Sequence, residues 1–344
     1  MRYENVCLAS FGSAIPPIEL SSAAIEEELK PLYERLKLPQ GRLELMTGIK
    51  QRRLWSPGTK PSDGAAKAGK QALATSGINP ADISCLIFTS VSRDMMEPAT
   101  AAFVHRHLGL PSSCLLFDLS NACLGFINGM VMLANMIALG QIRAGLVVAG
   151  ETAEDLIHST LKHLLTDTGL TRKSVKPLFA SLTIGSGAVA LVMTAQSYHD
   201  SGHYLRGCTF QANSAYNHLC QGGQNAEQGT LMSTDSEELL TRGIETAASC
   251  WHNFKRELQW KTNSIDHFFC HQVGRAHAER LFSTLQLDPS KNFETLSQLG
   301  NVGSVSAPIT MALAVEQGVL SVGQRVAILG IGSGINSLML GVDW

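Results

Sequence analysis

Cys123 is the residue whose type and position first suggest chemistry. It stands in SNACLGFING (120–129), between a polar turn and a run with helical spacing. A sulfur at a helix N-terminus meets unpaired N–H groups and the positive end of the helix dipole, and both favour the thiolate. Taken alone, the stretch fits a small buried core residue better. Cys123 is therefore a candidate nucleophile whose assignment depends on its partners.

Two other residues have the chemical types that a nucleophilic cysteine needs. His271 ends an apolar strand and begins HQVGRAH, and Asn301 lies in the glycine-flanked turn GNVGSVS. Each by itself is more typical of a structural residue or a turn-former. Together, a neutral imidazole and an amide N–H are donors suited to an enolate or thioester oxygen. We therefore treat them as a candidate set with Cys123.

A glycine-rich segment near the C-terminus, GIGSG (330–334), is a candidate oxyanion loop. Its backbone N–H groups, from Gly332, Ser333 and Gly334, would act with the amide of Cys123. The segment has neither GxSxG nor GxGxxG spacing, so that neither a serine hydrolase nor a dinucleotide site is indicated.

The elements that would position these residues alternate between short apolar strands and helices. Continuous rather than alternating hydrophobicity indicates strands covered on both faces, and hence a layered α/β architecture. Asp63 is expected to cap the first helix. The predicted strands are 83–90, 115–120, 145–151, 188–193, 267–272 and 326–332, and the predicted helices are 63–76, 99–108, 124–139, 151–164, 234–257, 274–285 and 305–317.

An internal repeat brings the candidates together. The segment 83–92 resembles 265–274, an offset of 265 − 83 = 182, and NACLGF (121–126) aligns with LGNVGS (299–304), an offset of 178. A third pair, 145–151 and 325–332, has an offset of about 180. The nearly constant offset indicates a duplicated core with equivalent turns on either side of a shared crevice. We expect an N-terminal half, 1–180, with the cysteine, and a C-terminal half, 181–344, with the histidine and asparagine.

Composition excludes several classes of protein. The chain has 344 residues and a formal net charge of -2, so that no basic surface for nucleic acid or an anionic membrane is expected. No signal peptide or membrane-spanning segment is indicated. The eight cysteines include no CxxC pair, and no Cys/His spacing for a metal site occurs. These features predict a reduced, cytoplasmic protein without a metal.

The motifs together resemble one superfamily. NACLGF, HQVGR, GNVGSVSAP and GIGSG, with TGIKQRRLW (47–55) and GETA (150–153), resemble the thiolase superfamily in its ketoacyl synthase III branch. The resemblance implies a duplicated five-layered αβαβα fold, a homodimer, and a triad formed by Cys123, His271 and Asn301. It also implies acyl transfer from a CoA or carrier-protein thioester to the cysteine, followed by a Claisen condensation with no further cofactor.

Glu97 distinguishes between branches of that superfamily. In ordinary synthase III enzymes the residue before the corresponding proline is usually apolar, whereas SVSRDMMEP resembles the segment of OleA-like enzymes, which join two fatty acyl thioesters. There the glutamate acts as a base and its loop reaches the partner's active site. Joining two unactivated chains needs an α-proton removed, whereas decarboxylation of a malonyl group does not. Glu97, buried among Met95, Met96 and Pro98, is the expected base in trans; composition alone favours a surface glutamate.

Substrate contacts are predicted at two places. The helix 124–139, with Phe126 and Met130, would line an apolar channel for long acyl chains, although core packing is the better reading for any single methionine. Arg52, Arg53 and Trp55 match a family segment near the pantetheine entrance, where arginines would pair with phosphate. A surface or ion-pair role for the arginines is equally supported.

The sequence thus predicts non-decarboxylative condensation of two fatty acyl thioesters to a β-keto acid or thioester. The alternatives left open are a ketosynthase joining a β-ketoacyl to a fatty acyl thioester, giving pyrone or dialkylresorcinol precursors, and a synthase III that uses malonyl-carrier protein. A non-catalytic subunit that binds acyl chains or carrier protein is a further alternative, which the intact Cys, His and Asn set disfavours. Chain length, the donor's carrier and the pathway served stay open.

Overall fold

One continuous nine-stranded sheet forms the framework, and its two halves, called the first and second sheets below, have the same strand order. The computed structural model describes residues 1–225 and 229–344. In the first sheet, β1 (Val6–Ala14) is followed by β7 (Gly187–Ala195), β6 (Ala144–Glu151), β4 (Cys85–Phe88) and β5 (Leu115–Asp118). In the second, β8 (Tyr204–Ala212) is followed by β13 (Asn336–Asp343), β12 (Arg325–Gly332) and β11 (His267–Cys270). A single register pair, Cys7 opposite Tyr204, joins β1 to β8.

Strand directions confirm the internal repeat. In both sheets the first three strands run antiparallel to their neighbours, and the fourth pairs parallel with the third, as β4 does with β6 and β11 with β12. A parallel bridge between Phe268 and Asn292 stands where the first sheet has β5. Because β7 pairs with β1 and β6, it belongs to the first half. The boundary therefore falls after Ala195 rather than at the predicted residue 180.

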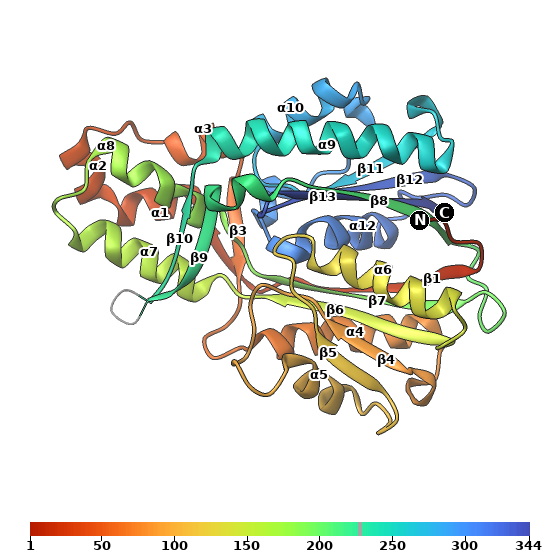
Figure 1. Cartoon of the computed structure of the whole chain (residues 1–344). Coiled ribbons are helices and arrows are strands. Elements are labelled where there is room, and N and C mark those ends of the chain that lie inside the picture. The colour runs from red at the N-terminus through yellow and green to blue at the C-terminus, as the bar shows by residue number, and fades with distance from the viewer. Residues whose placement is uncertain (226–228) are drawn as a thin grey trace.

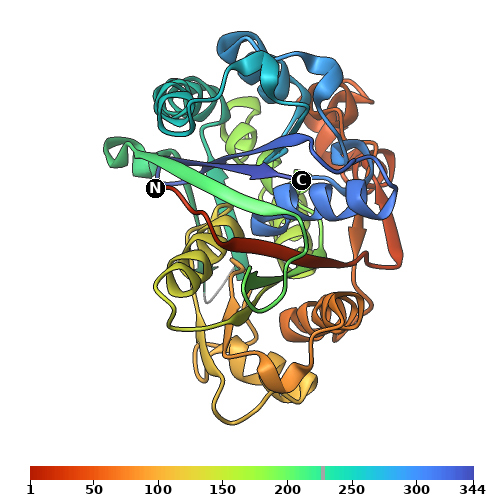
Figure 2. The same cartoon turned by 90° about the vertical axis from the view of Figure 1, so that its right-hand side faces the viewer.

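Five layers are visible in the side view (Figure 1), as the thiolase-like reading predicts. The helices α4 (Pro61–Ser76) and α5 (Thr100–Leu108) cover the outer face of the first sheet, and α9 (Ser236–Leu258) and α10 (Arg275–Leu285) cover that of the second. Between the sheets lie α6 (Gly125–Ala138) and α12 (Ser306–Glu316), and the perpendicular view keeps the same order (Figure 2). Since both central helices are enclosed, apolar side chains surround them on most sides.

A smaller cap packs at one end of the layers, on the left in Figure 1. Ile25, Leu32, Leu161 and Leu182 form its core. Its helices are α1 (Ser22–Glu28), α2 (Lys30–Leu36), α3 (Arg42–Thr47), α7 (Glu154–Thr166) and α8 (Arg172–Val175), with α11 (Leu296–Leu299) against β3, and its strands are β2 (Ile18–Ser21), β3 (Gln51–Leu54), β9 (Cys220–Asn225) and β10 (Gly229–Thr234).

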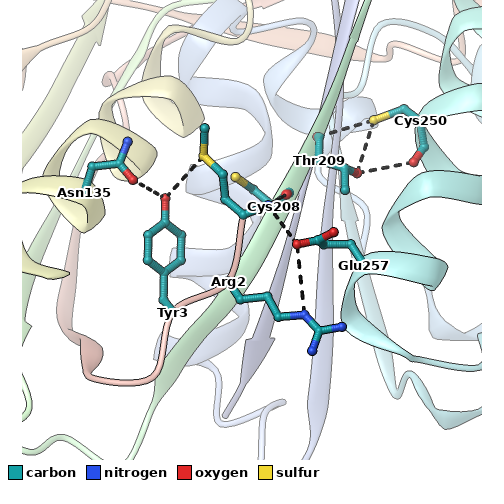
Figure 3. Close-up of polar contacts among 8 residues, drawn as sticks. Arg2, Tyr3, Asn135, Cys208, Thr209, Cys250 and Glu257 are labelled. Atoms are coloured by element: carbon teal, nitrogen blue, oxygen red, sulfur yellow. Dashed lines mark hydrogen bonds and ion pairs between the residues drawn. The ribbon is translucent and has the colours of Figure 1, made fainter.

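The N-terminal residues tie the central layer to the outer one (Figure 3). The Tyr3 hydroxyl donates to Oδ1 of Asn135 on α6 at 2.7 Å. The amino group of Met1 and the Arg2 guanidinium pair with Glu257 on α9, at 3.1 and 4.0 Å. Thr209 of β8 and Cys250 of α9 add a buried contact nearby.

Predicted and observed elements agree closely in position. All six predicted strands and seven predicted helices are present, with ends shifted by up to three residues. One capping detail is wrong: α4 begins at Pro61, so that Asp63 is its third residue and accepts from the Lys60 N–H at 3.0 Å. Within the described residues, no helix combines the length and apolar character that crossing a membrane requires.

Candidate active site

A tight turn presents Cys123 at the start of α6. Ala122 has a φ of +45°, a backbone conformation that residues with a Cβ rarely adopt. Because the alanine side chain is small, the conformational strain there stays small. Gly125 then lets the helix approach β4, because a Cβ there would lie 2.1 Å from the carbonyl oxygen of Thr89. The packing of α6 against β4 therefore fixes the backbone turn that carries Cys123.

Cys123 is half-buried, and its surroundings favour the neutral thiol. Burial raises its pKa to about 12, and the negative charge of Glu151 and the neighbouring Cys220 act in the same direction. The predicted thiolate is therefore wrong for the free protein. Cys123 precedes Leu124, the N-cap residue, so that it lies outside the first helical turn, where the dipole is strongest.

His271 lies between two hydrogen-bond acceptors, and its neutral ring, which has one N–H, donates to only one of them at a time. It follows β11, is buried, and its Nδ1–H donates to the carbonyl of Ile331 at 2.8 Å. Its Nε2 lies 3.2 Å from Oδ1 of Asn301. Burial lowers the pKa of His271, and both contacts oppose that shift because they stabilise the imidazolium. The ring is therefore neutral at rest and prepared to receive a proton.

Asn301 belongs to the turn that precedes α12. Its backbone N–H donates to the Thr183 carbonyl at 2.9 Å, and its Oδ1 accepts from the Gly303 N–H at 3.1 Å. The side chain thus turns its oxygen to His271 and leaves the amide N–H₂ as the group that can donate to a substrate oxygen. Sequence reasoning expected the donor and missed the contact that orients the imidazole.

The GIGSG segment contacts the cysteine turn directly. Gly330 and Gly332 lie on β12, and the side chain of Leu124 packs on both: a Cβ on Gly330 would be 2.5 Å from Leu124 Cδ2, and one on Gly332 2.8 Å from Cγ. These glycines are thus required by the close approach of the cysteine turn. Since Ile331 between them holds His271, a continuous set of contacts connects Cys123, His271 and Asn301.

An amide pair that sequence reasoning missed links the same two turns. Asn121 donates to Oδ1 of Asn336 at 3.1 Å, and Asn336 donates back at 3.4 Å. Asn336 also donates to the Ser333 carbonyl at 3.0 Å, within the predicted oxyanion loop, and Asn121 donates to Asn128 of α6 at 2.7 Å. We call Asn121 and Asn336 the amide clasp. The only signal in the sequence was their position beside the two motifs.

Glu97 stands on an exposed loop. Met95 and Met96 are 40% and 85% exposed, and Glu97 itself is exposed. The prediction that residues of the same chain bury Glu97 is therefore wrong. The loop is anchored beyond the glutamate, where the N–H groups of Thr100 and Ala101 donate to Asp118 at 2.8 Å each.

The predicted phosphate contacts are corrected by the structure. Arg52 is fully buried and donates to the Leu20 carbonyl and the Ser22 hydroxyl, at 3.1 and 3.2 Å, and burial lowers its pKa to about 10. Arg53 forms an ion pair with Glu19 at 2.6 Å. Trp55 is buried, with its indole N–H on the Glu151 carbonyl at 3.0 Å. All three side chains thus make internal contacts: Arg53 has the ion-pair role that the sequence left open, whereas Arg52 is buried on neutral acceptors.

Phe126 and Met130 also have a packing role in the structure. Both are fully buried in the cluster between the two sheets, with Leu133 and Ile137 of the same helix. The channel prediction for these two residues therefore gives way to core packing.

The fold and the site together define a thiolase-superfamily acyltransferase. Residues 117–213 match the family of 3-oxoacyl-[acyl-carrier-protein (ACP)] synthase III, and residues 256–344 match its C-terminal part. The acyl-CoA:acyl-CoA alkyltransferases of Shewanella oneidensis and Xanthomonas campestris are 39% and 38% identical to this chain, with 100% of both proteins covered in each case. The β-ketoacyl-[acyl-carrier-protein] synthase III of Natranaerobius thermophilus is 25% identical, over 96% of this chain and 97% of its own.

Solved structures extend the likeness to three dimensions. Cerulenin-bound OleA from Xanthomonas campestris is 37% identical and superposes with a TM-score of 0.96, covering 100% of this chain and 98% of its own. A cysteine-to-serine variant of that protein, with bound lauric acid and lauroyl-CoA, is also 37% identical, with a TM-score of 0.95 over 99% and 100% of the two chains. The chain belongs to the ketoacyl synthase III family of the thiolase superfamily, within its OleA-like group.

Proposed function

We propose that this protein condenses two fatty acyl-CoA molecules head to head without decarboxylation. The observation that carries the proposal is full-length identity of 39% and 38% to two acyl-CoA:acyl-CoA alkyltransferases, against 25% to a β-ketoacyl synthase III. A glutamate before Pro98 agrees with it, because this reaction needs a base on carbon. An OleA structure with bound lauroyl-CoA supports an acyl-CoA substrate.

In the first half-reaction Cys123 accepts an acyl group. Its thiol proton passes to Nε2 of His271 as sulfur attacks the thioester carbonyl, and the imidazolium is stabilised by the carbonyl of Ile331 and Oδ1 of Asn301. The oxyanion accepts hydrogen bonds from the backbone N–H of Cys123 and the Asn301 N–H₂. The CoA thiolate leaves and takes the proton from His271.

In the second half-reaction Glu97 removes an α-proton from the second acyl-CoA. The enolate carbon attacks the carbonyl of acyl-Cys123, the carbon–sulfur bond breaks, and the cysteine thiolate leaves. Water then protonates the thiolate, and Glu97 returns its proton to solvent, so that both groups regain their starting states. The product is a β-ketoacyl-CoA, whose hydrolysis yields the β-keto acid. No cofactor beyond the thioesters takes part in this proposal.

Glu97 acts, in this proposal, from the partner subunit of a homodimer. Support comes from the edge of the first sheet, where Leu115 of β5 is 51% exposed, and from the apolar Val91 and Met96 of the Glu97 loop, which are 54% and 85% exposed. Apolar side chains on an edge strand and an adjoining loop are typical of a surface that a second chain covers. We place the enzyme in the cytoplasm, since all eight cysteines are free thiols.

The decisive experiment supplies a long-chain acyl-CoA as the only substrate. We expect free CoA, an acyl adduct on Cys123, and a long-chain ketone from spontaneous decarboxylation of the β-keto acid. Glu97→Ala should still acylate but fail to condense. Turnover only with malonyl-carrier protein would show a synthase III instead, and no adduct would favour a non-catalytic subunit.

Mixing two inactive variants tests the trans arrangement. Cys123→Ala and Glu97→Ala subunits, exchanged into heterodimers, form one intact site per heterodimer if the glutamate acts across the interface. Random exchange then restores about a quarter of wild-type activity, since half of the dimers are mixed and each has one intact site. A mixture that stays inactive despite confirmed exchange would place Glu97 in its own subunit's site.

A further inference from the structure

One buried carboxylate joins two loops of the site that the proposed reaction does not itself connect. Glu151 is the last residue of β6 and is 5% exposed. Its Oε2 accepts from the Ser92 N–H at 3.0 Å and the Ser92 hydroxyl at 2.8 Å. Its Oε1 accepts from the Val91 N–H at 3.0 Å, and from the Ser304 N–H and hydroxyl at 3.2 and 2.8 Å.

These five donors come from two loops with different proposed roles. Val91 and Ser92 form the stem of the Glu97 loop, and Ser304 lies in the turn that carries Asn301. Gly303 of that turn is packed so closely that a Cβ on it would lie 3.0 Å from Oε1. A carboxylate is the only side chain of this size that accepts from all five, because an amide would turn its N–H₂ towards groups that donate.

The stem of the Glu97 loop has a second anchor at Asp94, which lies between Ser92 and Glu97 in the sequence. The Ser62 N–H and hydroxyl donate to Asp94 at 2.9 and 2.6 Å, and the Asp94 N–H donates to Thr100 at 3.2 Å. The Ser92 hydroxyl also accepts from the Thr152 N–H at 3.0 Å. The exposed Glu97 therefore lies on a loop whose backbone is fixed on both sides by partly buried hydrogen bonds.

We propose that Glu151 is a positioning residue for the condensation, which holds the stem of the Glu97 loop and the Asn301 turn in one geometry beside Cys123. The proposal rests on the proposed function for the role of Glu97, but the contacts of Glu151 do not depend on it. The same carboxylate raises the pKa of Cys123, so that it also biases the nucleophile towards the neutral thiol.

Glu151→Gln tests the proposal through two readouts that should move in opposite directions: the condensation rate should fall, and the rate of Cys123 labelling should rise. Acylation is measured as the burst of CoA release, and condensation as β-keto product. Misplacing a reacting group by about 1 Å costs about 100-fold, so that we expect condensation to fall about 10- to 100-fold more than acylation. Labelling of Cys123 by methyl methanethiosulfonate at pH about 8 should become several-fold faster, because the nearby negative charge is gone.

Two serine variants separate the loops and keep the test valid if Glu151→Gln is unstable. Ser92→Ala loosens only the stem, so that condensation should fall while acylation is unchanged. Ser304→Ala loosens only the Asn301 turn, so that acylation should fall as well. Ser10→Ala is the matched control, because its buried hydroxyl donates to the Ala72 carbonyl at 2.6 Å, between β1 and α4 and away from both loops.

The outcomes decide the proposal separately from the proposed function. Equal loss of acylation and condensation in Glu151→Gln and Ser92→Ala, in step with lower melting temperature and without faster labelling, would reduce Glu151 to a structural residue and overturn the proposal. If wild-type protein does not condense acyl-CoA, the proposed function is wrong. In that case faster labelling in Glu151→Gln but not in Ser10→Ala still supports the link to Cys123, and unchanged labelling overturns it.

Discussion

Cys123 should react slowly with small thiol reagents in the free protein, because its surroundings hold it in the neutral form. The ordinary cysteine pKa of 9.0 leaves about a tenth of the thiol ionised at pH about 8. A pKa of about 12 leaves about one part in ten thousand. The thiolate population is therefore about a thousandfold smaller than in an unperturbed cysteine.

Nucleophilicity offsets part of that loss. A more basic thiolate attacks faster, and a Brønsted coefficient of about 0.4–0.5 returns a factor of about 15–30 over three pKa units. Cys123 should therefore react with a small disulfide-forming reagent about 30- to 60-fold more slowly than a free cysteine at the same pH.

The assay is mass spectrometric labelling with methyl methanethiosulfonate over a range of pH, with Cys123→Ser as the control. Cys220, which is also half-buried, serves as an internal reference for accessibility, since the remaining six cysteines are buried. A rate that equals or exceeds that of free cysteine, with a titration midpoint near pH about 7, would refute the reasoning. It would show a thiolate–imidazolium pair with His271 at rest.

Three other predictions test the supports of the site. Gly330→Ala and Gly341→Ala place a Cβ 2.5 and 2.3 Å from leucine methyl groups, of Leu124 and Leu258, so that each should lower the free energy of unfolding by about 1–3 kcal/mol. Only Gly330→Ala should slow acylation. If Gly341→Ala slowed acylation equally, the role given to Leu124 would be contradicted. Asn121→Ala, Asn336→Ala and the double variant should each slow acylation by a similar factor, because either substitution opens the amide clasp; additive losses in this double-mutant cycle would show independent roles. Because burial lowers the pKa of His271, its neutral form persists below the ordinary value of 6.5, and the acid limb of the acylation rate should have its midpoint below that pH; a midpoint at or above 6.5 would show that burial does not dominate.

The fold was predictable where hydrophobic runs are continuous. Strands such as β6 and helices such as α6 are buried on most sides, so that their apolar residues mark them without tertiary information. β1, with the sequence VCLASFGSA, was not predicted, because serine and glycine interrupt its pattern although it is almost wholly buried. The boundary between the halves was misplaced for a related reason: only pairing shows to which sheet β7 belongs.

The candidate site was predictable in its residue types but not in its surroundings. Motif spacing singled out Cys123, His271 and Asn301, and the fold connects these three candidates through Leu124 and Ile331. The protonation state of Cys123 was not predictable from the sequence. Burial and the charge of Glu151 raise its pKa, and Cys123 lies just outside the first turn of α6, where the helix dipole would lower it. Arg52 was misjudged because a buried arginine that donates to a carbonyl and a hydroxyl has the same sequence signature as one that binds phosphate.

The two halves of the repeat share a backbone arrangement but differ in the functional groups that they bring to the site. Cys123 precedes α6 and Asn301 precedes α12, so that corresponding turns of the two halves carry different functional groups. A symmetric ancestor built from two identical halves would place the same residue in both turns. The present chain therefore has a pseudo-twofold scaffold with a chemically asymmetric centre: the candidate nucleophile lies in one half, and the candidate imidazole and amide side chains lie in the other.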